Sequence, residues 1–435
     1  MDLGDALAWL DRHQNLERML GERPVGPPDP ERMRSLVDVL GHPEAASPVI
    51  HVTGTNGKTS TSRAITMLLM AKGLSVGTYT SPHLERINER LRIDDDPISD
   101  AELAAVLSDL AGVEPLVAAG SPSWFELITA AALRWFSDRP VDVAVVEVGI
   151  GGRWDATNVV DAAVAVITNI GLDHLELLGP TRAHVAGEKA GIVKPGSTLV
   201  LGDEDPGLLA IFEREAPRRL WWSGRDYACT RNDMAVGGRT LDIRTPGATY
   251  EGVWLGVHGR HQGANFTTAV AAVEAMFEAP VEEELVREAA GAMCSPGRLE
   301  VVGRRPVVVL DGAKNEEGAS RAAAAVAEEF AGARSRILVV GLLRGKDAAG
   351  MLEALGAGSA RLVVACAPPS PRAQPVHEVA SAARKLGVRQ VLERETVADA
   401  VAAAMESAHP DDLILVAGSL YVVGAARAAL GLRPS

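Results

Sequence analysis

Residues 49–60, VIHVTGTNGKTS, combine an apolar run with a turn that carries two glycines, a lysine and hydroxyl side chains. The backbone N–H groups of such a turn point toward an anion, and the helix that follows presents its positive end to the same anion. The lysine adds a point charge for the outer phosphates of a nucleotide, and a neighbouring hydroxyl can reach magnesium. The segment predicts a nucleotide-phosphate site formed by Asn56, Gly57, Lys58, Thr59 and Ser60.

This loop is shorter than the general phosphate-loop pattern G-x-x-x-x-G-K-[ST], which places its glycines five residues apart. Gly54 and Gly57 are only three residues apart. The flanks nevertheless fit, because residues 49–54 predict a strand and residues 60–72 place apolar side chains at helical spacing. The alternative is a glycine-rich turn with a surface lysine, which leaves the crowded polar side chains of the turn unexplained.

Glu147 stands near the end of an apolar run that predicts a strand over 141–149. A carboxylate at the carboxyl end of a strand parallel to the phosphate-loop strand is where nucleotide enzymes hold magnesium. The alternative is a carboxylate that caps a turn, and the long apolar run before Glu147 favours the metal. The glycines at 149, 151 and 152 lack the last glycine of G-x-G-x-x-G, so they do not predict a dinucleotide site.

Three further residues each keep two interpretations. His174 follows Asp173 after another predicted strand and is either structural or part of the phosphate site. Lys189 lies on a predicted helix with apolar neighbours, so it is either a surface lysine with a buried stem or a buried amine with a lowered pKa. Ser81 begins a charged loop that either offers its hydroxyl to a metal or is simply solvated.

The second half of the chain offers a cation and a polar turn. Arg298 follows Ser-Pro-Gly, where the pattern of elements breaks, and an arginine at such a hinge can reach a phosphate. The predicted strand 306–310 ends in a turn that gathers Asp311, Lys314 and Asn315. Because ligands of open α/β sheets bind at the carboxyl ends of the strands, we expect these ends to face the first half, with the site between.

Short apolar runs alternate with helical patterns, which is typical of a parallel sheet covered on both faces. The fold class is therefore α/β, with an N-terminal P-loop mononucleotide-binding domain at 1–294, whose sheet is mostly parallel, and a smaller C-terminal Rossmann-like domain at 298–435. Residues 218–257 predict a few antiparallel strands. The other predicted strands are 76–81, 162–170, 197–202, 336–341, 361–367, 389–393 and 412–417, and the main helices are 99–111, 122–137, 181–191, 261–277, 317–331, 347–356, 376–386 and 397–408.

Composition narrows the class of protein. A chain of 435 residues is too long for one ordinary core. The 57 Asp and Glu against 43 Lys and Arg give a net charge of −14, which argues against a nucleic-acid partner. We expect no signal peptide and no membrane span, because the first residues are acidic and no apolar stretch approaches ~18 residues. The three cysteines have no metal spacing and fit reduced thiols, so we expect a cytoplasmic protein.

Ten segments resemble the folylpolyglutamate synthase and dihydrofolate synthase family, within the Mur ligase superfamily. They occur in the family's order along nearly the whole chain and read HVTGTNGKTS, TSPHLERINERLRI, WFELIT, VVEVGIGGRWDATN, ITNIGLDH, GEKAGIVKPG, GRHQGANFTTA, GRLEVV, LDGAKN and AGSLYVVG. The resemblance implies a ligase in which ATP phosphorylates the carboxylate of dihydropteroate or tetrahydrofolate, after which the amine of L-glutamate displaces phosphate. It also implies small-molecule substrates and a monomer.

The resemblance assigns a role to each candidate residue. The predicted catalytic residues are Lys58, Lys189 and His174. The expected nucleotide contacts beyond the phosphate loop are Asn265, Arg298 and Asp311. The residues that match the family's magnesium ligands, with two metal sites expected, are Ser81, Glu147 and His174. Lys189 matches a carbamylated lysine. The expected substrate contacts are Ser123, Trp124, Phe125, Trp154, Asp155, Lys314 and Ser419.

The chain departs from the family pattern at two positions. It reads GKTS where folate enzymes often read GKGS, and Lys314 replaces the histidine of the usual DGAHN, so a titrating imidazole becomes a fixed cation. Lys314 is the best support for a second hypothesis, a Mur-type ligase with a different acid and amine. A third hypothesis is a nucleotide-binding protein without catalysis, and the presence of Lys58, Glu147, His174 and Lys189 together argues against it.

Overall fold

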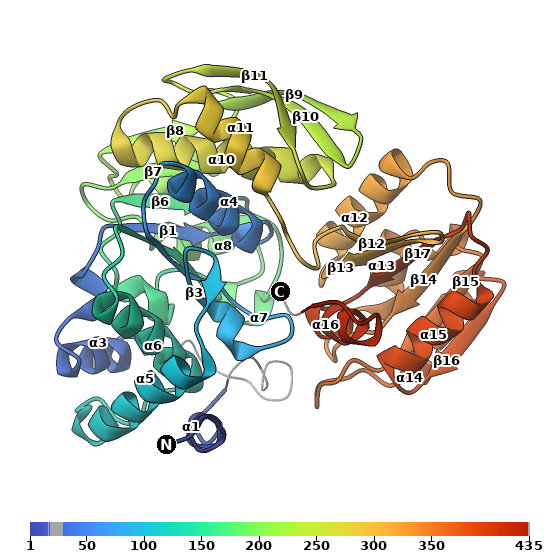
Figure 1. The fold of residues 1–435 in the computed structure, drawn as a ribbon, viewed down its shortest axis with the longest axis horizontal. Helices are drawn as coiled ribbons and strands as arrows, with labels where there is room; N and C mark the ends of the chain where they lie inside the picture. The colour runs from blue at the N-terminus through green and yellow to red at the C-terminus, as the bar shows by residue number, and fades with distance from the viewer. Residues whose placement is uncertain (16, 18–28, 434–435) are drawn as a thin grey trace.

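Two α/β bodies lie side by side in the protein, as Figure 1 shows. The structure is a computed structural model that describes residues 1–15, 17 and 29–433. In this part of the chain, the first body holds an eight-stranded and a three-stranded sheet, and the second body holds a six-stranded sheet. The predicted α/β class is confirmed, with a large, mostly parallel N-terminal sheet and a separate C-terminal domain.

The eight-stranded sheet has the order β4-β3-β2-β5-β1-β6-β7-β8, and its strands are parallel except at the β2-β3-β4 edge. The strands are β1 (Val49–Thr53), β2 (Val76–Tyr79), β3 (Leu91–Ile93), β4 (Asp96–Pro97), β5 (Val143–Glu147), β6 (Val164–Ile167), β7 (Thr198–Leu201) and β8 (Arg219–Trp222). Because β1 lies between β5 and β6, the residues that follow these three strands meet at one edge of the sheet.

The antiparallel prediction is wrong for Trp221 and Trp222. They belong to β8, which pairs in parallel with β7 and extends the large sheet. The reason is that β8 is a partly exposed edge strand, and partial exposure is also typical of antiparallel strands. The rest of that region is antiparallel as predicted, in the order β11-β10-β9, with β9 (Ala228–Ala235), β10 (Gly238–Arg244) and β11 (Thr249–Leu255).

Helices cover both faces of the large sheet. One face carries α4 (Lys58–Ala71), α10 (Arg260–Phe277) and α11 (Glu283–Ala292), which share a core with the three-stranded sheet. The helices that pack on the other face are α1 (Leu3–Leu10), α3 (Pro30–Val39), α5 (Asp100–Val113), α6 (Trp124–Asp138), α8 (Arg182–Ala190) and α9 (Leu209–Glu213). A short helix, α7 (Leu175–Leu178), follows β6. Capping boxes start α5 at Ser99 and α6 at Ser123, so local sequence sets where these helices begin.

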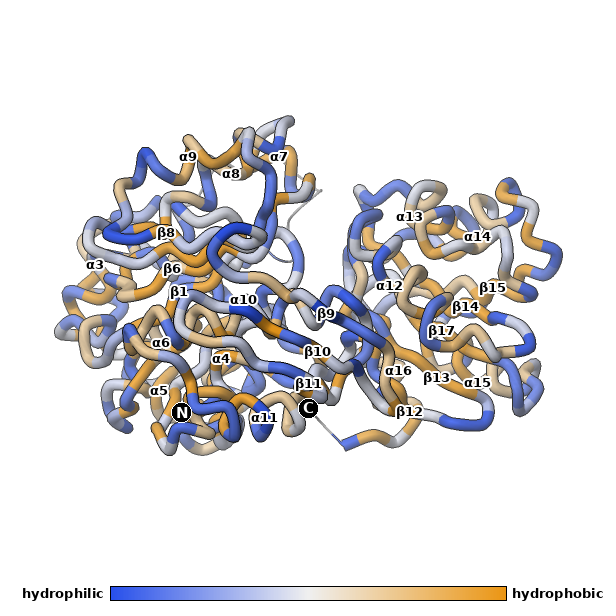
Figure 2. Tube along the Cα trace, turned by 90° about the horizontal axis from the view of Figure 1, so that it is seen from above, coloured by the Kyte–Doolittle hydropathy of each residue, from blue (hydrophilic) through white to orange (hydrophobic). Residues whose placement is uncertain are grey.

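The C-terminal sheet has the order β12-β13-β17-β14-β15-β16 and is parallel except for the edge strand β12. The apolar stretches of its inner strands run through the middle of this body in Figure 2. Its strands are β12 (Glu300–Arg304), β13 (Val307–Asp311), β14 (Arg336–Val340), β15 (Leu362–Cys366), β16 (Val391–Arg394) and β17 (Leu413–Ala417). Its helices are α12 (Glu316–Glu329), α13 (Ala348–Ala354), α14 (Val376–Lys385), α15 (Val397–Ser407) and α16 (Leu420–Ala429).

The segment from α11 to β12 joins the two bodies, and the predicted boundary at 294–298 falls in it. This boundary stays a prediction. Five short 3-10 helices complete the described elements: η1 (Pro43–Ala45), η2 (Ile87–Arg90), η3 (Glu114–Leu116), η4 (Ala156–Val159) and η5 (Ala357–Ser359). None of the helices in residues 1–15 or 29–433 is both long and apolar enough to cross a membrane.

Candidate active site

A large cleft lies between the two bodies and encloses about 1930 Å³ of space not occupied by protein atoms. Its walls are built from residues that follow β1, β5 and β6 in the first body and β13, β14 and β17 in the second. The predicted site residues that line it are Asn56, Gly57, Lys58, Thr59, Ser60, Ser81, Ser123, Phe125, Glu147, Trp154, Asp155, His174, Asn265, Arg298, Asp311, Lys314 and Ser419. Trp124 and Lys189 are the two predicted residues that the cleft does not expose.

The phosphate loop joins β1 to the N-terminus of α4. Gly57 precedes this helix with φ at 84°, and a Cβ there would lie 2.5 Å from Oδ1 of Asn265 on α10. Only glycine meets both conditions without strain. Gly57 provides no side chain to cap α4, so the N–H groups of the first turn face the cleft and fit a phosphate.

Lys189 lies beneath the loop and not in the cleft. Its side chain is 3 % exposed, and its Nζ donates to the carbonyl oxygen of Gly54 at 2.9 Å. Burial, and then the charge of Lys58, lower its pKa well below the ordinary value. Gly152 permits this position of α8, because a Cβ there would lie 2.7 Å from the carbonyl oxygen of Glu188. The surface-lysine interpretation is therefore wrong, and Lys189 is a buried amine.

Glu147 ends β5 beside the phosphate loop and is 1 % exposed. Thr59 Oγ1 donates to its Oε1 at 3.0 Å, and the backbone N–H of Ser81 donates to its Oε2 at 3.3 Å. Burial raises the pKa of Glu147 to about 7, although Lys58 and these hydrogen bonds lower it. A buried carboxylate with neighbouring hydroxyls suits Mg²⁺, which keeps water and substrate phosphates as its other ligands. The described residues hold no set of three His, Cys, Asp or Glu that would form an all-protein metal cage.

His174 and Asp173 meet two lysines of the second body. Lys346 Nζ donates to Oδ1 of Asp173 at 3.0 Å, and Lys314 Nζ lies 3.6 Å from its Oδ2. Burial raises the pKa of Asp173, but the charges of Lys314, His174 and Lys346 outweigh burial and hold it well below the ordinary range. Burial and then Lys314 lower the pKa of His174 to about 3, so its imidazole is neutral.

The neutral imidazole of His174 fits a metal ligand, because it has one nitrogen with a free lone pair. Its Nε2 lies 3.4 Å from Nζ of Lys314. The same lone pair serves either the lysine ammonium or a metal, so Lys314 competes with a metal for His174. A histidine at position 314 would not impose this permanent charge.

The predicted nucleotide contacts approach the loop from two sides. Asn265 comes from α10, and its Nδ2 donates to Oε1 of Gln262 at 3.1 Å. Asp311 ends β13, where its carboxylate accepts from the N–H groups of Leu299 and Ala313, each at 2.9 Å. Burial raises the pKa of Asp311, while the charge of Arg298 lowers it. The structure thus brings the linker arginine and the strand-end carboxylate together.

The region predicted for the acceptor lies where α6 begins. The ring of Phe125 lies 6.2 Å from the ring of Tyr79, tilted by 43°, and Asp155 is buried. Asp155 accepts from the N–H groups of Ile150 and Thr157, each at 3.0 Å, and burial raises its pKa. The loop after β5 therefore presents an ordered carboxylate beside an aromatic wall.

Trp124 does not join this wall. It is 3 % exposed, its indole N–H donates to Oδ1 of Asp11 at 3.2 Å, and the guanidinium of Arg90 lies 4.8 Å from its ring. Helical geometry explains the difference between the two aromatic side chains, because successive residues of a helix point about 100° apart, and of these two Phe125 faces the cleft. The prediction of Trp124 as a direct substrate contact is therefore not supported.

Sequence reasoning missed several polar residues that line the cleft. Glu17 accepts from both Nη1 and Nη2 of Arg90, at 2.9 and 2.7 Å. Arg372 Nη1 donates to the carbonyl oxygen of Glu17 at 2.8 Å, from 355 positions away. Lys346 gave a weak signal, since it follows the predicted strand 336–341, but Glu17 and Arg372 gave none.

Comparisons with known proteins agree with this geometry. Residues 123–273 match the family model described as the Mur ligase middle domain, and residues 297–420 match the one described as Mur ligase, glutamate ligase domain. The fold and the cleft between its two bodies therefore define a ligase of the Mur type.

Relatives narrow this class to one family. The dihydrofolate synthase/folylpolyglutamate synthase of Mycobacterium tuberculosis is 39% identical over 96% of this chain and 94% of its own length. The structure of the M. tuberculosis folylpolyglutamate synthase complexed with ADP has a TM-score of 0.92, with 37% identity over 100% of this chain and 99% of that one. A bifunctional folylpolyglutamate synthase/dihydrofolate synthase of Yersinia pestis, complexed with AMPPNP and Mn ion, has a TM-score of 0.86 and 30% identity over 99% of this chain and 98% of that one.

This chain belongs to the dihydrofolate synthase/folylpolyglutamate synthase family, and it is an ATP-dependent acid–amino-acid ligase. The resemblance drawn from the sequence is confirmed. The alternative of a Mur-type ligase for a different acid and amine finds no support among these relatives.

Proposed function

We propose that this chain joins L-glutamate to dihydropteroate, to reduced folates or to both, through an acyl phosphate. The observation that carries the proposal is that one cleft holds the phosphate loop and Glu147 on one wall and Lys314 and Lys346 on the other. A phosphorylated carboxylate and an incoming amino acid can therefore meet between the two bodies. The cleft also excludes water from the acyl phosphate when substrates fill it.

The phosphate loop binds and orients ATP. Lys58 neutralises charge on the outer phosphates, while Asn265, Arg298 and Asp311 hold the nucleotide from α10, the linker and the second body. Burial and then the charge of Lys314 lower the pKa of Lys58 to about 8, so the ammonium form is still the main form at neutral pH. A half-buried ammonium stabilises a transferring phosphoryl group more strongly than a fully exposed one.

Magnesium would be held by Glu147 and Ser81, and a second ion by His174, where it supplies charge neutralisation for the phosphates. Lys189 supports these ions indirectly. Its neutral buried amine is the form that reacts with CO2, and carbamylation would replace this neutral group beneath the loop with an anion. Two structural features support this proposal. Lys189 is buried, and its Nζ shares the carbonyl oxygen of Gly54 with Lys58, an arrangement that two positive charges would disfavour.

Phe125, Trp154 and Asp155 would hold the pterin or pteroate portion of the acceptor, with Ser123 fixing the start of α6. Lys314, Ser419 and Lys346 would hold L-glutamate from the second body. Two ammonium groups suit a ligand with two carboxylates, and one carboxylate of the protein, Asp173, already lies between them. The substrate glutamate would displace part of this contact.

Phosphate release with ATP and magnesium, measured while the acceptor is varied, tests the proposal. Release that needs both dihydropteroate and L-glutamate identifies dihydrofolate synthase activity, and release with tetrahydrofolate and L-glutamate identifies chain extension. If no phosphate is released with any folate acceptor, the proposal is wrong. Replacing L-glutamate with L-aspartate is the matched control for the amino acid.

The protein is proposed to act as a monomer on small molecules in the cytoplasm. The described residues include three free cysteines, which fit a reducing compartment. The net charge of −14 disfavours a nucleic-acid partner. Light scattering after size exclusion tests the oligomeric state, and a mass near 45.7 kDa supports the monomer.

A further inference from the structure

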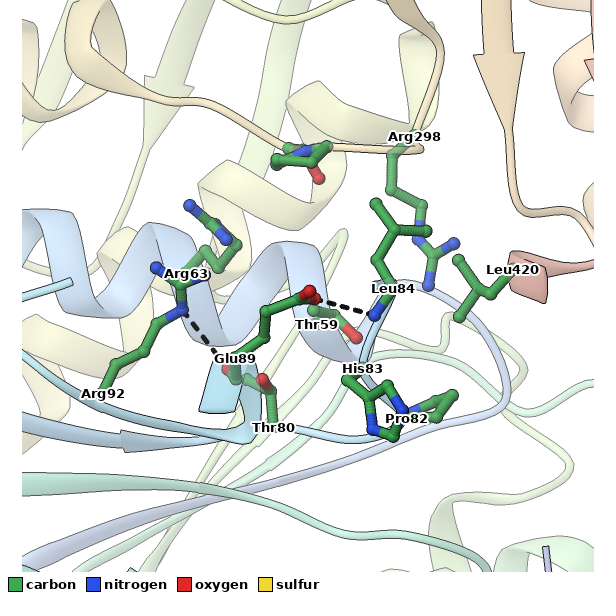
Figure 3. Close-up of a pocket in the computed structure, with 12 residues that line it drawn as sticks. Thr59, Arg63, Thr80, Pro82, His83, Leu84, Glu89, Arg92, Arg298 and Leu420 are labelled. Carbon is green, nitrogen blue, oxygen red and sulfur yellow. Dashed lines mark hydrogen bonds between the residues drawn. The ribbon is translucent and has the colours of Figure 1, made fainter. Parts of the chain in front are cut away.

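A side pocket adjoins the cleft, and Figure 3 shows the residues that line it, from α4, the loop after β2 and the segment that joins the two bodies. It shares Thr59, Pro82, Arg298 and Leu420 with the cleft and encloses about 450 Å³ of space not occupied by protein atoms. Its floor is formed by α4 and by the loop that follows β2. None of the roles assigned above uses Arg63 or Arg92, which line this pocket and not the cleft.

Two arginines reach the floor of the pocket and share one counter-charge. Arg63 Nη2 lies 3.2 Å from Oδ2 of Asp95, and Arg92 Nη1 lies 3.5 Å from Oδ1 of the same carboxylate. Glu89 also lines the pocket, but its oxygens already accept three backbone N–H groups of the loop. Arg298 at the mouth brings a third guanidinium group to the space, although it also faces Asp311 and Glu147 of the cleft.

Arg63 keeps unused capacity for an acceptor, whereas Nε and Nη1 of Arg92 already donate to the backbone carbonyl oxygens of Glu89 and Asp95. The side chain of Arg63 is 13 % exposed, and its Nε is buried without a hydrogen-bond partner among the described residues. A buried N–H without an acceptor lowers the stability of the folded protein, and a bound ligand can supply the acceptor. Burial and then the charge of Arg63 lower the pKa of Arg92, which indicates that the two guanidinium groups repel each other. An anion in the pocket would relieve this repulsion.

The position of the pocket indicates which anion it binds. Thr59 lines both spaces, and its hydroxyl is bonded to Glu147, so the pocket lies beside the place where the acceptor carboxylate is phosphorylated. Guanidinium groups recognise a carboxylate with paired hydrogen bonds. A folate that already ends in glutamate has a free α-carboxylate a few bonds from its reacting γ-carboxylate, whereas dihydropteroate has none.

We propose, on the basis of the function proposed above, that the side pocket binds the α-carboxylate of the terminal glutamate of a folate acceptor. Arg63 and Arg92 bind this carboxylate, and Asp95 lowers the affinity of the pocket for it because it competes for the same arginines. The pocket then serves the addition of glutamate to a folate and is idle when the acceptor is dihydropteroate. It is a specificity subsite that separates the two reactions of one active site.

Comparison of the two acceptors in one pair of variants tests this subsite. Arg63→Gln should raise the KM for tetrahydrofolate about tenfold, the size of one lost charge-assisted hydrogen bond, and leave the KM for dihydropteroate within about twofold. Asp95→Asn should act in the opposite direction and lower the KM for tetrahydrofolate, since it removes the competing carboxylate. Asparagine tolerates the left-handed backbone of Asp95 (φ 62°), so this variant keeps its turn.

The activity with dihydropteroate also serves as the folding control, and Arg134→Gln, on the exposed end of α6, is the matched arginine control. Equal effects of Arg63→Gln on both acceptors, or no effect on either, would overturn the subsite while leaving the proposed function intact. A wild-type protein that glutamylates dihydropteroate alone would overturn it as well.

Calorimetric titration provides a readout besides turnover. Wild-type protein should bind tetrahydrofolate more tightly than tetrahydropteroate, which lacks the glutamate, and Arg63→Gln should remove this difference. If the preference survives in Arg63→Gln, the carboxylate lies elsewhere. Because titration needs no reaction, it tests the subsite even if the proposed ligase reaction fails.

Discussion

Lys58 and Lys189 donate hydrogen bonds to the same acceptor, the carbonyl oxygen of Gly54, at 3.0 and 2.9 Å. Two ammonium groups on one oxygen, one of them buried and the other half-buried, repel each other strongly, because the low local dielectric screens them poorly. The less exposed of the two, Lys189, responds with a pKa well below the ordinary value. A neutral amine at this position relieves the repulsion, and a carbamate there would attract Lys58 instead.

Lys189→Ala should abolish phosphate release, because the variant lacks the amine that becomes the anion beneath the loop. Removal of CO2 from the buffers should lower the activity of the wild-type protein reversibly, and bicarbonate should restore it. With ¹³C-bicarbonate, the wild-type protein should show a carbamate carbon signal by NMR that Lys189→Ala lacks. Phosphate release by Lys189→Ala at the wild-type rate would refute the carbamate.

Lys194→Ala is the matched control for this experiment. Lys194 follows α8 closely, and burial also lowers its pKa, but its Nζ donates to the carbonyl oxygen of Asn158 at 3.2 Å, away from the cleft. We expect this variant to keep both the activity and the carbamate signal.

Glu147 should make the stability of the metal-free protein fall as pH rises. Its folded pKa of about 7 exceeds the ordinary 4.5, so between these values the folded state binds more protons than the unfolded state. The free energy of unfolding should therefore decrease from about pH 5 to pH 8, by up to ~3 kcal/mol. Glu147→Gln should remove this slope. Urea denaturation of both proteins in magnesium-free buffer measures it, and parallel pH curves would contradict the raised pKa.

Lys314→Met should raise the KM for L-glutamate about tenfold and leave the KM for ATP unchanged, because it removes one cation from the wall opposite the phosphate loop. Lys314→Arg should restore much of the loss. Lys385→Met, at an exposed position on α14, is the matched control. If kcat falls while the KM for L-glutamate stays constant, Lys314 acts on the reaction and not on glutamate binding.

Arg239 ties the three-stranded sheet to the second body. It is fully buried, and its Nη1 donates to Oε1 of Glu329 on α12 at 2.5 Å, while the N–H of Gly259 donates to the same carboxylate at 2.8 Å. Nδ1 of His258 also lies 2.7 Å from Oε2 of Glu329. Arg239→Met leaves Glu329 without the guanidinium, so we expect a loss of ~3 kcal/mol in the free energy of unfolding.

A double-mutant cycle measures the Arg239–Glu329 pair. Arg239→Met combined with Glu329→Gln should cost clearly less than the sum of the two single changes, because no uncompensated charge remains buried. Arg260→Met is the control, since Arg260 is 70 % exposed in its pairing with Glu328 and should contribute at most ~1 kcal/mol. Additive costs for Arg239→Met and Glu329→Gln would show that the pair has no specific coupling.

The phosphate loop could be predicted because all of its parts are local. A strand, a turn and a helix follow one another within residues 49–72, and each has its own sequence pattern. The parallel strands of the second body were predicted for the same reason, whereas its antiparallel edge strand β12 was not predicted. Trp221 and Trp222 show the limit of this reasoning, because alternation reports which face of a strand is buried but not the direction of the neighbouring strand.

The burial and orientation of individual side chains could not be predicted in the same way. Sequence left Lys189 between an exposed and a buried position, and it placed Trp124 beside Phe125 in the acceptor region. Both outcomes depend on packing between elements: Lys189 is buried because the loop after β5 lies on α8 at Gly152, and Trp124 turns toward Arg90.

The sequence by itself determined the α/β elements, the phosphate loop and, through its ordered motifs, the family of this protein. Only the tertiary structure decided which charges face one another: Asp173 with Lys346 across 173 positions, and Arg63 with Arg92 around one carboxylate. The physical reason is that local patterns fix each element and its buried face through hydrophobic burial. Contacts between strand ends depend on how the sheets and the two bodies pack together, which no local pattern encodes.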